Sequence, residues 1–252
     1  MQKIACQTIT FGRIDTPEQF WDMMAQCKKA GYDGVETGTN FLTAADKARF
    51  EDMELEYACT HLGANYQDRE ACAALPDQAA RMGEIVKAMG SDLVFISGGN
   101  WLNKSAEDYK WEAALYNRIG AKLKEIDAKL LYHNHHWEFA DNKMGLNILY
   151  NETDPSLVRL GPDVGWVQRG GEMPGPFVKK HLDRIEAVHF KEFSADERFT
   201  EMGKGIVDFQ GVWDVIKDKN WWIIAEQDTT TTTAFESVKE NADYLLKLIG
   251  RA

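Results

Sequence analysis

The sequence of 252 residues predicts an α/β fold in which eight parallel strands close into one barrel. Short apolar runs rich in β-forming residues recur eight times along the chain, and helical patterns separate them. Each unit takes about 31 residues, enough for one strand, a crossover helix and two short loops. Eight units in about 250 residues is the usual size of a (β/α)8 or TIM barrel. We therefore expect one barrel domain over residues 1–252.

The predicted strands lie within eight apolar runs. The runs are IACQTITF from Ile4, GVETG from Gly34, LEYACTHLG from Leu55, LVFISGG from Leu93, LLYHNHHWEF from Leu130, LVRLGPDVGW from Leu157, IEAVHFKEF from Ile185 and WWIIAEQD from Trp221. No short hairpin loops join them, and parallel strands need crossover connections. A doubly wound open sheet is the alternative, but it usually carries a glycine-rich phosphate loop, and neither common form of that loop occurs here. The barrel is therefore favoured.

Three of the intervening segments carry clear helix signals. The segment TPEQ supplies an N-cap at Thr16, a first-turn proline and a glutamine three residues after the cap, and Gly31 lies where a C-cap belongs. Ser105 precedes apolar residues spaced three and four apart over 109–126, and the same spacing over 235–249 predicts a C-terminal helix. The helices after the second and fifth runs are short or weakly patterned.

Composition and charge exclude several classes of function. The chain has 29 Lys and Arg against 40 Asp and Glu, a formal net charge of −11. Nucleic acids and anionic membranes bind surfaces with clustered cations. Because this chain is strongly acidic, we expect neither as a partner. The four cysteines form no C-x-x-C pair. No apolar run is long enough for a signal peptide or a membrane span, so we expect a cytoplasmic protein.

Polar side chains follow the predicted strands at their carboxyl ends, where parallel barrels carry their active sites. These residues are Glu36, His61, His133, Asn134, His135, His136, Glu138, Asp163, His189, Lys191, Glu226 and Asp228. Glu36 alone could cap a helix or pair with a lysine, and His61 alone could be structural. Several carboxylates at one mouth repel one another, and a divalent cation is the usual remedy. The set as a whole therefore predicts a metal-dependent site.

The motifs YHNHHWEF, GPDVGW, VHFKEF and IIAEQD on the last four strands resemble the xylose-isomerase-like TIM-barrel superfamily. TITFG, GYDGVETG and THLG resemble it too, so the resemblance covers nearly the whole chain. The superfamily includes sugar and sugar-phosphate isomerases and epimerases, inosose dehydratases and endonuclease IV. The resemblance implies one divalent metal held by Glu138, Asp163, His189 and Glu226. Many isomerases of the family place their fifth-strand glutamate about where His133 stands here, so His133 or His135 could replace or support Glu138.

The resemblance also implies a chemistry. Three carboxylates and one imidazole suit Mn²⁺ or Mg²⁺, with Co²⁺ and Zn²⁺ as alternatives. The metal would act as a Lewis acid on a ketose or ketone, while Glu138 and Glu226 transfer the proton next to the carbonyl through an enediolate. The expected substrate contacts are His61, His133, His135, Trp166, Lys191 and Glu36. Lys191 could hold a substrate oxygen or phosphate, or pair with Glu36.

Four functions remain open at this point. A metal-dependent isomerase or epimerase of a sugar or sugar phosphate stands first, and a lyase that dehydrates an inosose or 3-keto sugar stands second. A non-catalytic sugar-binding barrel comes next. A nuclease of the endonuclease IV kind fits least, because of the charge and because Trp166 stands where those relatives carry a histidine. The expected partner is a small carbohydrate, and relatives suggest a homo-oligomer.

Overall fold

The computed structural model describes residues 2–101 and 103–251 of the chain. Its centre is a parallel sheet of eight strands in the order β6-β5-β4-β3-β2-β1-β8-β7. The strands are β1 Lys3–Gln7, β2 Gly34–Glu36, β3 Glu56–Leu62, β4 Leu93–Ser97, β5 Lys129–His133, β6 Val158–Leu160, β7 Ala187–Phe190 and β8 Trp222–Ala225. Two bridges, Leu160 to Ile185 and Asp163 to His189, join the two outer edges of the sheet. The predicted α/β barrel is thereby confirmed.

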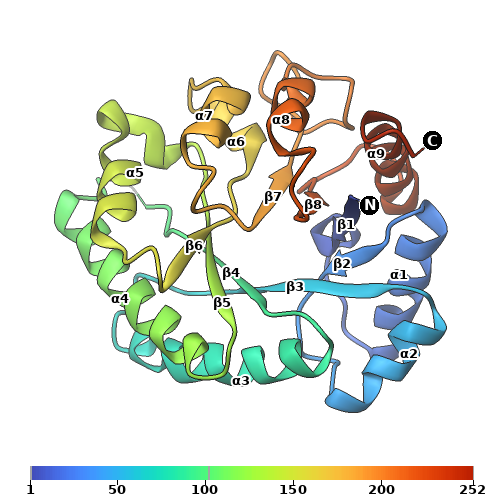
Figure 1. The fold of residues 1–252 in the computed structure, drawn as a ribbon, viewed down its shortest axis with the longest axis horizontal. Coiled ribbons are helices and arrows are strands. Elements are labelled where there is room, and N and C mark those ends of the chain that lie inside the picture. Colours follow the sequence, from blue (N-terminus) through green and yellow to red (C-terminus); the bar gives the residue numbers. More distant parts are fainter. Residues whose placement is uncertain (1, 102, 252) are drawn as a thin grey trace.

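Helices surround the barrel and alternate with its strands (Figure 1). They are α1 Pro17–Ala30, α2 Lys47–Asp52, α3 Leu75–Ala88, α4 Ala106–Lys124, α5 Ala140–Glu152, α6 Val164–Arg169, α7 Pro174–Lys180, α8 Phe209–Ile216 and α9 Ala234–Leu248. The capping box at Thr16 and the left-handed Gly31, with φ of 110°, confirm the predicted ends of α1. Within the described ranges, no helix has the length and apolar content that a membrane crossing requires.

The strands end earlier than the apolar runs that predicted them. After β1 the chain turns into a 3-10 helix, Thr8–Phe11, and after β5 it forms another, Trp137–Phe139. In the sixth run, the Asp163 side chain accepts a hydrogen bond from the backbone N–H of Trp166 and caps α6. A parallel strand must stop where the chain turns outward to its crossover helix. The final residues of these runs therefore belong to the loops of the barrel mouth.

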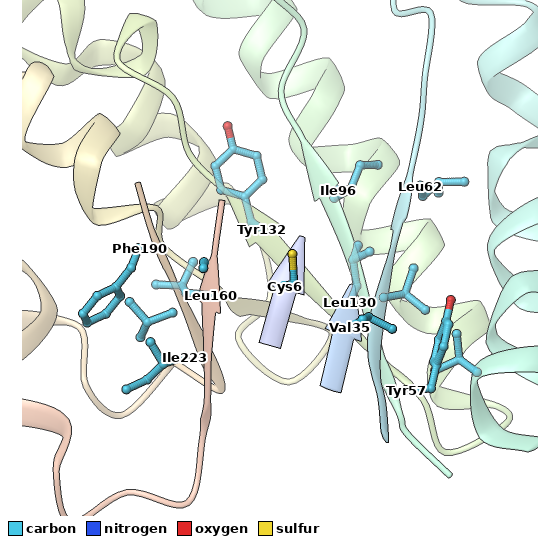
Figure 2. Close-up of a cluster of buried hydrophobic side chains, with 14 of the residues drawn as sticks. Cys6, Val35, Tyr57, Leu62, Ile96, Leu130, Tyr132, Leu160, Phe190 and Ile223 are labelled. Atoms are coloured by element: carbon cyan, nitrogen blue, oxygen red, sulfur yellow. The ribbon is translucent and has the colours of Figure 1, made fainter. Parts of the chain in front are cut away.

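The core has an outer and an inner part. The outer cluster combines strand residues such as Val35, Ile96 and Tyr132, drawn in Figure 2, with residues of the surrounding helices. The inner cluster consists of strand residues, among them Phe95 and Leu131, which fill the barrel. The interior below the mouth is therefore apolar and packed.

Candidate metal centre at the barrel mouth

Alternation along the strands decides which side chains face the inside of the barrel. Successive strand residues point to opposite sides of the sheet. Since Val35, Ile96 and Tyr132 pack in the outer cluster, the next residue of each strand points inward, and the same holds for β7 and β8. In β3, His61 points inward because the residue after it, Leu62, packs in the outer cluster. The inward residues at the mouth include Glu36, His61, Ser97, His133, His189 and Glu226, and Asp163 joins them through its bridge to His189. We call these seven residues the polar layer.

His189 and Glu36 form one half of the polar layer. Nε2 of His189 lies 2.7 Å from Oε2 of Glu36, and both side chains are buried. The inner-cluster ring of Phe95 meets the His189 ring edge-on at 4.6 Å. Nδ1 of His61 lies 3.4 Å from Oε1 of Glu36. Burial opposes ionisation of Glu36, but His189 and His61 outweigh it and hold the pKa of Glu36 well below its usual range.

His133 contacts two carboxylates in the other half. Its Nε2 lies 3.1 Å from Oε2 of Glu226 and 3.4 Å from Oδ2 of Asp163. Burial opposes a charge on the ring, but Glu226 and Asp163 outweigh it and raise the pKa of His133 to about 10. Oε2 of Glu226 also lies 3.8 Å from Nε2 of His189. Glu226 therefore connects the two halves.

Lys191 offsets part of the negative charge. Its buried Nζ donates to Oε1 of Glu226 at 3.0 Å and to Oδ1 of Asp228 at 2.7 Å, and lies 3.5 Å from Oδ2 of Asp163. Burial alone would lower the pKa of Lys191, but these carboxylates raise it above its usual range. Its ion-pair partners are these three groups and not Glu36, the pairing considered from the sequence. Lys191 therefore orients the Glu226 carboxylate.

The donor set at the mouth fits a divalent cation. Among the residues that the structure describes, one ligand atom each of His133, His189 and Glu226 lies within 4.8 Å of the others. Oδ2 of Asp163 and Nδ1 of His189 are buried without a hydrogen-bond partner there. Buried polar atoms usually have partners, so these lone pairs are available to a ligand. Two imidazoles and two carboxylates suit Zn²⁺ or Mn²⁺ by ligand type.

Glu138 lies on the opposite side of β5. Its Oε1 accepts a hydrogen bond from the hydroxyl of the outward-facing Tyr132 at 2.7 Å, and its Oε2 accepts one from the backbone N–H of His135 at 2.7 Å. A Cβ atom added at Gly98 would lie 2.8 Å from Oε1 of Glu138 and 3.4 Å from Oε2 of Glu112 in α4. Burial raises the pKa of Glu138 to about 7. The metal-binding and proton-transfer roles of Glu138 stay predictions.

Aromatic rings cover the mouth beside β5 and α6. The His135 ring stacks on Trp137 at 4.0 Å, and the His136 ring on Trp166 at 5.0 Å. Trp166 is only 5% exposed and packs against Phe193 at 4.7 Å. Burial lowers the pKa of His135, which keeps the ring neutral. The substrate contacts expected of His135 and Trp166 stay predictions.

A cavity of about 260 Å³ lies next to the polar layer. Glu36 and His61 line it, together with apolar side chains such as Phe20 and Phe41 and the polar Asn40. Ligand pockets commonly combine an apolar wall with a few polar groups that orient the ligand. The cavity therefore offers space for a small molecule beside the candidate metal centre.

Ser97 is the member of the polar layer that the sequence interpretation missed. Its Oγ lies 3.0 Å from Nε2 of His61 and 3.3 Å from Nδ1 of His133. A search for charged groups and imidazoles at strand ends passes over a serine. The available signal was periodic: Ser97 stands two residues after the inward-facing Phe95 on the same strand.

Comparisons with known proteins agree with the barrel fold. A model of the Xylose isomerase-like TIM barrel family matches residues 24–248. Inosose dehydratase of Lacticaseibacillus casei is 28% identical over 277 aligned positions, covering 93% of this chain and 90% of the relative. A sugar phosphate isomerase/epimerase structure from Parabacteroides distasonis, 19% identical, superposes with a TM-score of 0.80 and covers 98% of both chains. The structure of IolI with a bound zinc atom, 14% identical, gives 0.76 and covers 99% of both. At these identities, the two structures show the shared fold alone.

Proposed function

This chain belongs to the xylose isomerase-like TIM barrel family, and from that premise we propose that it is a divalent-metal-dependent isomerase or epimerase of a sugar or sugar phosphate. The reaction removes a proton from a carbon next to a carbonyl and then returns a proton to carbon. One observation carries the proposal: the buried group of His133, His189 and Glu226 with Asp163, beside a cavity of about 260 Å³. The similarity to a sugar phosphate isomerase/epimerase supports the substrate class.

In this proposal the metal ligands are His133, Asp163, His189 and Glu226. His133 takes the place predicted for Glu138 because its Nε2 lies 3.1 Å from Glu226 and 3.4 Å from Asp163. Both oxygens of Glu138 accept hydrogen bonds on the other side of β5. When bound, a divalent cation supplies a Lewis acid that polarises the substrate carbonyl. The zinc atom bound to IolI supports a metal in this fold.

Glu226 is the proposed proton-transfer residue. Burial opposes its ionisation, but Lys191 and His133 outweigh burial and lower the pKa of Glu226, so the group is present as the carboxylate. Glu226 is 8% exposed at the mouth, whereas Glu138 is 0% exposed. Lys191 holds Oε1 and leaves Oε2 facing the imidazoles. Glu226 takes the substrate proton on its carboxylate and returns it to carbon, a contribution of roughly 10²–10⁴-fold.

The cavity residues orient the substrate in this proposal. Glu36 is ionised and accepts hydrogen bonds from substrate hydroxyl groups. The His61 side chain is 28% exposed and lines the same cavity, so its ring forms part of the substrate wall. Phe20 and Phe41 exclude water from the opposite side of the ligand. The substrate is thereby held next to the polar layer.

A dehydratase is the second candidate. The observation that favours it is the similarity to inosose dehydratase, 28% identical over 93% of this chain. Elimination of water needs an acid at the departing oxygen. His135 lies near the polar layer, with its ring 5.0 Å from the His133 ring. In this reading Glu226 removes the proton from carbon, and the neutral ring of His135 accepts that proton and passes it to the leaving hydroxyl.

The test is a panel of ketoses, their phosphates and keto-inositols, incubated with metal-loaded protein in D₂O and followed by mass. An isomerase or epimerase places solvent deuterium on carbon without loss of water. A product lighter by one water would show the dehydratase, and His135→Gln should then stop elimination while proton exchange continues. Absence of both exchange and elimination across the panel would overturn the proposed function.

A further inference from the structure

Ser97 bridges two imidazoles of the polar layer. It is the last residue of β4, and its Oγ lies 3.0 Å from Nε2 of His61 and 3.3 Å from Nδ1 of His133. A serine hydroxyl carries one hydrogen and two lone pairs, so it can accept from one neighbour and donate to the other. Neither the proposed ligand set nor the proposed proton transfer uses this residue.

We propose that Ser97 is a positioning residue that fixes which ring nitrogen of His133 carries the hydrogen. Through its own hydroxyl hydrogen, it also fixes which ring nitrogen of His61 carries the hydrogen. The inference rests on the metal site of the proposed function. It concerns the direction of hydrogen bonds from His133 to Ser97 to His61.

The direction follows from the position of His133 Nε2. This atom faces Oε2 of Glu226 and Oδ2 of Asp163, so it is the nitrogen that would bind the cation. A neutral imidazole that binds metal through Nε2 carries its hydrogen on Nδ1. That N–H has Oγ of Ser97 as its acceptor at 3.3 Å. The other ring nitrogen of a metal-binding histidine almost always donates to a nearby oxygen, which fixes the ring orientation.

The hydroxyl of Ser97 then has one hydrogen bond left to make, as a donor. Having accepted from His133, it donates its own hydrogen to Nε2 of His61 at 3.0 Å. His61 therefore carries its hydrogen on Nδ1, which lies 3.4 Å from Oε1 of Glu36. The same carboxylate has Nε2 of His189 at 2.7 Å from its other oxygen. A continuous series of side chains thus joins the two imidazole ligands through Ser97, His61 and Glu36.

This arrangement assigns His61 a defined state at the cavity wall. Both of its ring nitrogens face protein groups, Ser97 on one side and Glu36 on the other. His61 therefore meets the substrate with its ring edge and does not donate a proton to it. A hydroxyl at position 97 is essential to this state, because an alanine offers neither an acceptor to His133 nor a donor to His61.

Metal affinity is the first readout. Loss of a group that orients a metal ligand typically costs 10–100-fold in affinity, so we expect Ser97→Ala to weaken Zn²⁺ binding by about that factor in a competition titration with a chelator. Ser97→Thr keeps the hydroxyl and should restore binding. The matched control is Ser91→Ala, which removes a hydroxyl that donates to the Ala58 carbonyl two residues before β4 begins. The metal-free proteins are compared by thermal unfolding to exclude loss of the fold.

The hydrogen positions are the second readout. The chain has six histidines, so ¹⁵N-labelled imidazoles can be assigned in the Zn²⁺-loaded protein by nuclear magnetic resonance. We expect the Nδ1–H form at both His133 and His61, and loss of that preference at His61 in Ser97→Ala. An Nε2–H form at His61 in the wild type, or equal Zn²⁺ affinity of wild type and a folded Ser97→Ala, would overturn the role of Ser97 alone. Failure of the wild type to bind any divalent cation would overturn the metal site and this inference together.

Discussion

On the inward side of β5, the carboxylate of Glu226 lies beside His133 and Lys191, whereas on the outward side Glu138 lies beside the hydroxyl of Tyr132. Both carboxylates are buried, yet the pKa of Glu226 is lowered well below its usual range and that of Glu138 is raised to about 7. Burial acts in the same direction on both, and the cationic partners make the difference.

The same contrast extends to the surroundings of each group. The inward side gathers Glu36, Asp163 and Glu226 around imidazoles, with lone pairs that have no donor. On the outward side, Lys104 pairs with Glu112 at 2.6 Å, and tyrosine hydroxyls supply further hydrogen bonds. The outward group is therefore satisfied by the protein itself, while the inward group is suited to a cation. Four predictions test this comparison.

The largest effect is expected for Glu226→Gln. The amide keeps the shape of the side chain but cannot accept the substrate proton, so turnover should fall by roughly 10²–10⁴-fold. Deuterium exchange into substrate measures the loss, and circular dichroism verifies the fold. Glu138→Gln is the matched substitution on the other side of β5 and should lose much less. An equal loss in both variants would contradict the difference in role between the two carboxylates.

The pH dependence of stability should reveal Glu138. Its folded-state pKa of about 7 exceeds the ordinary value of 4.5, so its contribution to stability is fully present below pH 4.5 and is lost as the pH rises to 7. The shift corresponds to roughly 3 kcal/mol. Glu138→Gln should lack this part of the pH dependence, because an amide does not ionise. The amide can still accept from His135 and donate to Tyr132, which preserves the fold. Urea unfolding of both proteins between pH 4 and about 8 measures the difference, and parallel profiles would contradict it.

The stabilisation by metal should depend on the inward residues of β5 and not on Glu138. A cation at about 100 times its Kd stabilises the folded state by about 2.7 kcal/mol, so a chelator should lower the melting temperature of the wild type. His133→Ala should reduce the metal content below one ion per chain, whereas Glu138→Gln should retain it. Elemental analysis of the two variants decides between His133 and Glu138 as the ligand from β5.

The smallest effect is expected for Tyr132→Phe. This change removes one hydrogen bond to Oε1 of Glu138, worth about 1 kcal/mol, and leaves the ring in the outer cluster. Because that hydrogen bond lowers the pKa of Glu138, the loss of stability with rising pH should extend to higher pH. Metal affinity should stay at the wild-type value. A marked drop in metal affinity would mean that the two sides of β5 are coupled.

Much of the candidate site could be predicted from the sequence. His189 and Glu226 stand at strand ends, in runs where alternate residues point to opposite sides of the sheet. The two-residue period of a strand therefore predicts that both side chains point inward. Asp163 follows a strand and caps a helix, which is also a local pattern. Ser97 obeyed the same alternation but lacked a charge to mark it.

The sequence by itself determined the eight alternating units, the closure into a barrel and the identity of the mouth, because these depend on local periodicity and chain length. Only the tertiary structure decided the position of Glu138. β5 ends at His133, and beyond that residue a 3-10 turn removes the two-residue period. There the direction of a side chain depends on contacts distant in sequence, and hydrogen bonds to Tyr132 and His135 hold Glu138 on the outward side of its strand.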